Sequence, residues 1–149
     1  MAQINPTVGA LNGNSRKIEE IIQEYSPKCD LIIFPEMCLT GYPPQDLLLD
    51  SSFIDKAAEA LKNIAVKVQE TPVILGTIRQ EEKKLFNTAA ILNKGQINAY
   101  RDKTHLPTYD VFDEARYFTS ADTRMPVELK IHGKLVKLGI EICEDLWED

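Results

Sequence analysis

Apolar and polar residues alternate along the chain with two different periods, which predict helices and strands respectively. Apolar positions at helical spacing predict one helix that is capped by Asn14 or Ser15 and ends before Pro27. The same spacing predicts a second helix, capped by Ser51 or Ser52, that runs to about residue 70. One helical turn is expected between them, over residues 45–49.

The remaining apolar segments have the pattern of strands. Leu31–Phe34 is continuously apolar, which is typical of a strand covered on both faces in an α/β sheet. Elsewhere apolar runs are bounded by turn residues or alternate with polar residues, as strands do. The expected strands are the end of a strand at residues 2–6, the buried strand at 31–34, a meander at 73–78, 85–92 and 96–100, and a hairpin at 127–131 and 135–142.

The second arm of the predicted hairpin leads directly into Cys143. Glu144 and Asp145 follow it and are suited to the first turn of a helix. A side chain at such a strand-to-helix turn is aimed out of the edge of a sheet. The backbone N–H groups and the positive end of the helix then favour a thiolate or an oxyanion beside it, so Cys143 is a candidate nucleophile.

Composition and charge exclude some classes of partner. The 149 residues include 17 basic and 23 acidic side chains, for a net charge of -6, and no block rich in Lys or Arg, so nucleic acid is not an expected partner. No apolar run approaches the roughly 18 residues that span a bilayer, and the first residues do not resemble a signal peptide. A cytoplasmic protein with no membrane partner is expected. The other cysteines, Cys29 and Cys38, are interpreted as small, reduced, buried residues.

Three reactive residue types stand just past strand-like segments: Glu36, Lys103 and Cys143. In open α/β sheets, residues at the carboxyl ends of strands converge on one crevice. A thiol can attack an amide carbonyl, a carboxylate can take its proton and later activate water, and an ammonium can stabilise the oxyanion. The set is therefore sufficient for acyl transfer, although a Glu after a Pro and a Lys in Arg-Asp-Lys are also typical of solvated surface positions.

Other chemistries have weaker signals. His105 and His132 have no companion ligands at metal spacing, and the chain contains no Gly-rich phosphate loop, so neither a metal site nor a nucleotide site is expected. The segment from Thr104 to Met125 has no regular period. Irregular segments of this length inside a compact domain are usually functional or mobile.

The three candidate residues occur in motifs that resemble those of the nitrilase superfamily of carbon-nitrogen hydrolases. The motifs are Phe34-Pro35-Glu36, Lys103-Thr104-His105-Leu106-Pro107 and Ile142-Cys143-Glu144-Asp145. Within the superfamily, three further segments resemble the glutaminase domain of glutamine-dependent NAD synthetases. These segments are residues 41–49, residues 109–118 and Cys143-Glu144-Asp145-Leu146-Trp147.

The resemblance implies roles for individual residues. Cys143 would form a glutamyl thioester, Glu36 would be the general base, Lys103 would stabilise the oxyanion, and Glu114 would be a second acid that supports the site. Four residues match positions that line a glutamine pocket: Tyr42, Tyr109, Glu144 and Trp147. The amidase step would need no cofactor and no metal.

The resemblance also implies a fold and partners. The family fold is a four-layer α-β-β-α sandwich, and residues 1–149 would supply only the part of that domain up to the cysteine turn. The expected partners are glutamine, a separate synthetase domain or subunit that uses ATP and magnesium to amidate deamido-NAD, and further copies of the chain in a homo-oligomer. Two alternatives remain open: another carbon-nitrogen hydrolase acting on a small amide, and an inactive assembly module.

Overall fold

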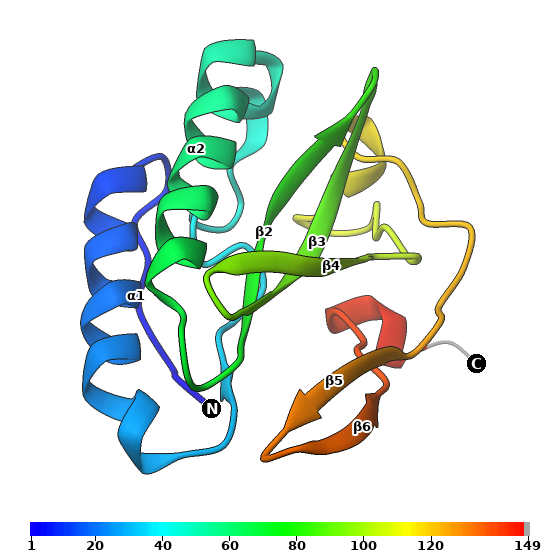
Figure 1. Cartoon of the computed structure of the whole chain (residues 1–149). Coiled ribbons are helices and arrows are strands. Elements are labelled where there is room, and N and C mark those ends of the chain that lie inside the picture. Colours follow the sequence, from blue (N-terminus) through cyan, green and yellow to red (C-terminus); the bar gives the residue numbers. More distant parts are fainter. Residues whose placement is uncertain (148–149) are drawn as a thin grey trace.

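The computed structural model describes residues 1–147 as helices packed on one face of a sheet and a hairpin packed on the other (Figure 1). The helices are α1 (Leu11–Tyr25) and α2 (Ser51–Lys67), with short 3-10 helices at Ser26–Lys28, Gln45–Leu49, Glu114–Arg116 and Cys143–Leu146. The strands are β1 (Ile32–Ile33), β2 (Val73–Glu81), β3 (Lys84–Asn93), β4 (Gln96–Asp102), β5 (Val127–Ile131) and β6 (Lys134–Leu138).

The strands form two sheets. The first has the order β1-β2-β3-β4, with β1 parallel to β2 and the next pairs antiparallel, and the second is the β5-β6 hairpin. The meander and the final hairpin were both predicted from the strand patterns. The segment Leu31–Phe34 is covered on both faces, as its apolar run predicts, although only two of its residues form the strand.

Alternate residues of β2 and β3 separate two apolar clusters. Val73 and Leu75 of β2 face α1 and α2 in the larger cluster, whereas Ile74 joins the smaller cluster with Leu129 of β5 and Ile142. This alternation is the two-residue period of a strand buried on both sides. The described residues therefore stack as helices, sheet and hairpin, in the α-β-β order of the first three layers of the expected sandwich.

The predicted starts of both long helices are wrong. The first helix begins at Leu11, and Asn14 is buried within it because its side chain bonds Thr7 N at 2.9 Å, Thr7 O at 2.8 Å and Leu39 O at 3.0 Å. The second helix is capped by Asp50, whose carboxylate accepts a hydrogen bond from Ser52 N at 2.9 Å, rather than by a serine. The partners of Asn14 include a residue that is distant in sequence, whereas Asp50 is a local cap one residue before the predicted serine.

Two predicted strands and one cysteine also differ from expectation. Residues 2–6 form no strand, although Ala2 N donates to Ile33 O at 2.8 Å beside β1. The last strand ends at Leu138 instead of residue 142 because β5, its pairing partner, begins only at Val127. Cys38 is buried as predicted, but Cys29 is exposed. None of the helices within residues 1–147 is long and apolar enough to cross a membrane.

Candidate active site

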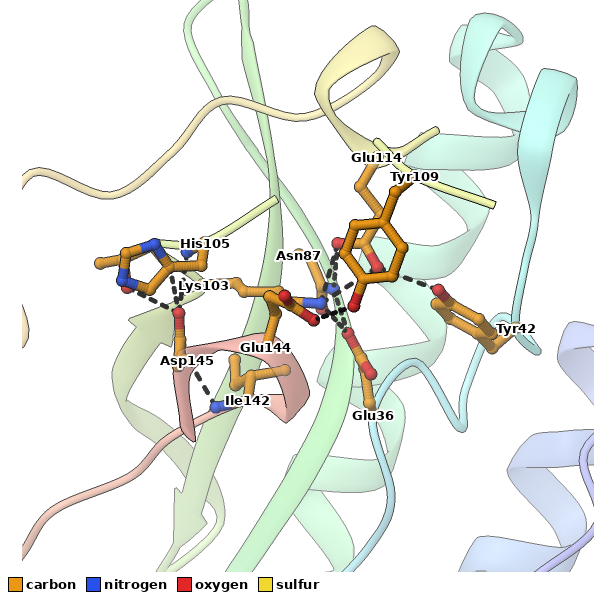
Figure 2. Close-up of polar contacts among 11 residues, drawn as sticks. Glu36, Tyr42, Asn87, Lys103, His105, Tyr109, Glu114, Ile142, Glu144 and Asp145 are labelled. Atoms are coloured by element: carbon orange, nitrogen blue, oxygen red, sulfur yellow. Dashed lines mark hydrogen bonds and ion pairs between the residues drawn. The ribbon is translucent and has the colours of Figure 1, made fainter. Parts of the chain in front are cut away.

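Glu36, Lys103 and Glu114 lie together at one end of the first sheet (Figure 2), and their charges act on Cys143 nearby. Glu36 follows β1, Lys103 directly follows β4, and Cys143 begins the 3-10 helix after the hairpin. Glu114 reaches the same place from the short 3-10 helix in the irregular segment 104–125. Residues from distant parts of the chain thus converge as the strand-end argument predicts.

Lys103 is the buried centre of this site. Its side chain has no exposed surface, and its Nζ donates to Glu36 Oε1 at 2.9 Å and to Glu114 Oε1 at 3.0 Å. Burial alone would lower the pKa of Lys103, but the charges and hydrogen bonds of the two carboxylates outweigh it and raise that pKa. Lys103 is therefore a protonated ammonium at neutral pH.

The carboxylate of Glu36 is held by one of its two oxygens. Asn87 Nδ2 donates to Glu36 Oε1 at 2.6 Å, and Lys103 Nζ donates to the same oxygen. Glu36 Oε2 accepts no hydrogen bond from residues 1–147. One oxygen fixes the orientation of the side chain, and the other remains available to take a proton.

Gly76 allows the backbone of Glu36 to lie against β2. A Cβ atom at position 76 would be 2.1 Å from Pro35 O and 2.7 Å from Glu36 Cα, far inside van der Waals contact. Leu39 N also donates to Gly76 O at 3.3 Å. Only glycine permits this approach of two backbone segments.

Glu114 is a second buried acid with three donors around it. Tyr42 Oη donates to Glu114 Oε1 at 3.0 Å, Asn87 Nδ2 to Oε2 at 3.4 Å, and Lys103 Nζ contacts both oxygens. Burial raises the pKa of Glu114 and the nearby charge of Glu36 adds to this, against the opposing effect of Lys103. The predicted supporting position of Glu114 agrees with these contacts.

Cys143 occupies a strained backbone position at the mouth of the site. Its φ is 49°, in the left-handed region, directly after the extended residue Ile142. Its pKa is raised, first by partial burial and then by the charge of Glu36, whereas Lys103 acts in the opposite direction. The position was expected to favour a thiolate or an oxyanion, whereas burial and the nearby carboxylates favour the neutral thiol more than Lys103 opposes it. The thiol needs a base to remove its proton.

Asp145 connects two of the catalytic motifs. Its Oδ1 accepts hydrogen bonds from Thr104 N, Thr104 Oγ1 and His105 N, and its Oδ2 accepts one from Ile142 N (Figure 2). The residue is 1% exposed. The first helical turn predicted at Glu144 and Asp145 is a short 3-10 helix, and the Asp145 carboxylate also binds the loop that follows Lys103.

Three of the four residues matched to a glutamine pocket make contacts in or beside this site, and the fourth is largely exposed. Tyr109 Oη donates to Glu144 Oε2 at 2.9 Å, and Tyr42 and Glu114 line a cavity of about 90 Å³ between residues 42–48 and 111–118. The hydrogen bond to Glu144 raises the pKa of Tyr109. Trp147 is 77% exposed, and its contact with a substrate stays a prediction.

Sequence reasoning missed Asn87, Gly76 and the role of Asp145. Asn87 interrupts the apolar strand β3, and a polar residue that is 1% exposed in such a strand is a usable signal. Gly76 interrupts the apolar run of β2 in the same way, which marks a close backbone approach. Within residues 1–147, no group of three or more His, Cys, Asp or Glu side chains is arranged to hold a metal ion.

The whole chain, residues 1–149, matches the carbon-nitrogen hydrolase family. The chain belongs to this family. Its Glu36, Lys103 and Cys143 occupy one site in the structure, in agreement with the three motifs from which the family was inferred.

Similar proteins refine this assignment. The glutamine-dependent NAD(+) synthetase of Synechocystis is 46% identical over 100% of this chain and 28% of its own length, and that of Aquifex aeolicus is 38% identical over 99% and 25%. The chain thus spans about a quarter of the length of these curated relatives.

Solved structures agree on the fold. The glutamine-dependent NAD+ synthetase of Acinetobacter baumannii superposes with a TM-score of 0.87 at 34% identity, covering 99% of this chain and 27% of that one. An amidase from Nesterenkonia has a TM-score of 0.73 at 18% identity, covering 91% of this chain and 51% of that one, and shares the fold. The predicted nitrilase-like α/β fold is confirmed.

Proposed function

We propose that this chain is the glutamine-hydrolysing part of a glutamine-dependent NAD synthetase and converts the side-chain amide of glutamine into glutamate and ammonia. The observation that carries the proposal is the buried ion pair between Lys103 Nζ and Glu36 Oε1, 2.9 Å long, beside the strained Cys143 turn. The names of the relatives from Synechocystis and Aquifex aeolicus support glutamine as the substrate.

The first half-reaction transfers the acyl group to the enzyme. Glu36 Oε2 takes the proton of the Cys143 thiol while the sulfur attacks the amide carbon of glutamine. Lys103 has three N–H donors, and its two carboxylate partners leave one for the oxyanion of the tetrahedral intermediate. The C–N bond then breaks, Glu36 returns the proton to the leaving nitrogen, and ammonia departs from a thioester.

The second half-reaction hydrolyses the thioester. Glu36 Oε2 takes a proton from a water molecule, whose oxygen attacks the thioester carbon, and Lys103 again stabilises the oxyanion. The C–S bond breaks, the proton moves from Glu36 to sulfur, and glutamate leaves. Because the pKa of Cys143 is raised, proton transfer to Glu36 accompanies the attack of sulfur.

The ammonia would serve a synthetase part that amidates deamido-NAD with ATP and magnesium, whereas the amidase step uses neither. This partner is proposed from the names of relatives that are about four times as long as the residues they share with this chain. A homo-oligomer is proposed with it.

The test treats the purified chain with 6-diazo-5-oxo-norleucine, a glutamine analogue that alkylates glutaminase cysteines, and maps the adduct by mass spectrometry. One adduct on Cys143, together with release of glutamate and ammonia from glutamine, is the expected result. Cys143→Ala removes both, whereas Cys29→Ser at the other exposed cysteine leaves both unchanged.

Two results would contradict the proposal. Hydrolysis of acetamide or an N-carbamoyl compound in preference to glutamine would assign the chain to a different carbon-nitrogen hydrolase. A folded chain that is neither alkylated at Cys143 nor active on any amide would support an assembly module.

A further inference from the structure

One buried carboxylate joins the segment that carries the cation to the segment that carries the nucleophile. Asp145 Oδ1 accepts hydrogen bonds from Thr104 N at 2.9 Å, Thr104 Oγ1 at 2.6 Å and His105 N at 2.8 Å. Asp145 Oδ2 accepts one from Ile142 N at 3.2 Å. Thr104 is bonded directly to Lys103 in the chain, and Ile142 directly to Cys143.

The ionised form of Asp145 is the one that fits this position. Burial would raise its pKa, but the hydrogen bonds from Thr104, His105 and Ile142 outweigh burial and lower it. Arg124 Nη1 also donates to Asp145 O at 3.1 Å, and the positive charge of Arg101 lies nearby. A carboxylate offers acceptors only, which matches four donors without a mismatch.

The group around Lys103 holds its place by other contacts as well. Lys103 N donates to Asn87 O at 2.9 Å, and Lys103 Nζ is bound to Glu36 and Glu114. Within residues 1–147, the polar contacts of the Cys143 turn with the rest of the molecule run mainly through the Asp145 carboxylate. Besides these, Arg124 donates to the Asp145 carbonyl and Tyr109 donates to Glu144.

We infer that Asp145 is a positioning residue, whose carboxylate holds the Cys143 turn against the Lys103 loop and so sets the sulfur at attacking distance from a substrate bound by Glu36 and Lys103. This inference rests on the proposed function for its catalytic meaning. The physical linkage itself depends only on the four hydrogen bonds. Loss of the linkage releases the turn and leaves Lys103 in place.

Release of the turn has a distinctive electrostatic signature. Burial raises the pKa of Cys143 most, the charges of Glu36, Glu114 and Glu144 raise it further, and Lys103 lowers it. When the turn moves into solvent, burial no longer raises the pKa of Cys143. The turn also moves away from Glu36 and Glu114, which raise this pKa, and from Lys103, which lowers it. The thiol then titrates at a lower pH, while its distance from the substrate increases.

The experiment compares Asp145→Asn and Thr104→Val with the unaltered chain. Asp145→Asn keeps the size of the side chain but places an amide N–H against at least one of the four donors, and Thr104→Val removes only the Oγ1 bond. Asp122→Asn is the matched control, since Asp122 is exposed and makes no hydrogen bond that would be lost within residues 1–147. The readouts are the pH midpoint of iodoacetamide labelling at Cys143, labelling at Cys38, and kcat and KM for glutamine.

In Asp145→Asn the labelling midpoint of Cys143 falls, so that it reacts faster at neutral pH, while kcat falls on the order of 10- to 100-fold with little change in KM. Thr104→Val lowers the labelling midpoint of Cys143 and kcat by smaller amounts. Asp122→Asn changes neither the midpoint nor kcat. Cys38 is buried with a pKa of about 12, so its continued protection shows that the fold is intact.

The inference is overturned if the Asp145→Asn midpoint and kcat equal those of the unaltered chain. If Cys38 becomes labelled in Asp145→Asn, the fold of that variant is disturbed and Thr104→Val is the test. An unchanged labelling midpoint of Cys143 in Thr104→Val then overturns the inference. An unaltered chain that does not hydrolyse glutamine refutes the proposed function alone. The labelling midpoint still tests Asp145 in that case.

Discussion

Lys103 Nζ and Glu36 Oε1 lie 2.9 Å apart in an ion pair whose cation is completely buried. The same ammonium binds Glu114, so one positive charge serves two carboxylates. Asn87 and Tyr42 supply the remaining donors as neutral groups. This balance of charge governs both the stability of the site and its chemistry.

Removal of the buried cation is expected to destabilise the fold. In Lys103→Met, Glu36 and Glu114 face each other without a counter-charge, and the free energy of unfolding falls by about 3 kcal/mol or more at pH 7. The loss is smaller at pH 5, because burial raises the pKa of Glu114 and this acid takes up a proton more readily there. Urea unfolding at both pH values measures it. Lys62→Met, at an exposed position on α2, changes stability by less than about 0.5 kcal/mol.

Asn87 is expected to be required for the orientation of Glu36. Asn87→Leu removes the 2.6 Å hydrogen bond to Glu36 Oε1, and hydrogen bonds to charged groups contribute roughly 1.5–3 kcal/mol. If that energy holds the base in place, kcat for glutamine falls by about 10- to 100-fold. Steady-state kinetics check this, with Asn63→Leu on the exposed face of α2 as the control. Equal kcat in the two variants would show that Lys103 alone orients the base.

Gly76 is expected to tolerate no side chain. In Gly76→Ala the new Cβ would lie 2.1 Å from Pro35 O, so the segment carrying Glu36 must move away from β2. Amide hydrolysis is lost, and the melting temperature falls. Gly139→Ala is the control, since no atom lies within 4 Å of its added Cβ and its φ is not in the left-handed region. Full activity in Gly76→Ala would mean that the position of Glu36 is not critical.

Removal of the charge of Glu36 is expected to make the Cys143 thiol more acidic and yet to lower the rate of amide hydrolysis. That charge raises the pKa of Cys143, so Glu36→Gln lowers the pH midpoint for iodoacetamide labelling and increases the thiolate fraction at neutral pH. Amide hydrolysis nevertheless falls, because no base remains to deliver the proton to the leaving nitrogen. Glu141→Gln, at an exposed position two residues before Cys143, serves as control. A midpoint that rises in Glu36→Gln would contradict this account.

The sequence predicts the strands of this fold better than it predicts the ends of its helices. The apolar periods of residues 73–100 and the turn at Asn93-Lys94-Gly95 specify the meander, because they depend on neighbours along the chain. The helix start at Leu11 depends on Asn14 bonding Leu39, a contact across 25 positions. Capping rules use local residues and cannot anticipate that contact.

The candidate site divides in the same way. Glu36, Lys103 and Cys143 could be found because each follows a strand-like segment and lies in a recognisable motif. Asn87 contacts Glu36 across 51 positions, and Asp145 contacts Thr104 across 41. The raised pKa of Cys143 was missed because burial and the sum of several charges depend on the folded arrangement.

The placement of Ile142 in the smaller apolar cluster means that the nucleophile belongs to a different layer from its base. Ile142 packs with Ile74 of β2 and Leu129 of β5, whereas Glu36 and Lys103 extend from the first sheet. The chemistry is therefore available only while the hairpin layer is docked. A local opening that costs about 1.4 kcal/mol would leave roughly one molecule in ten catalytically silent with its first sheet intact. The turnover rate would therefore depend on local opening between the hairpin layer and the first sheet, and not on global unfolding.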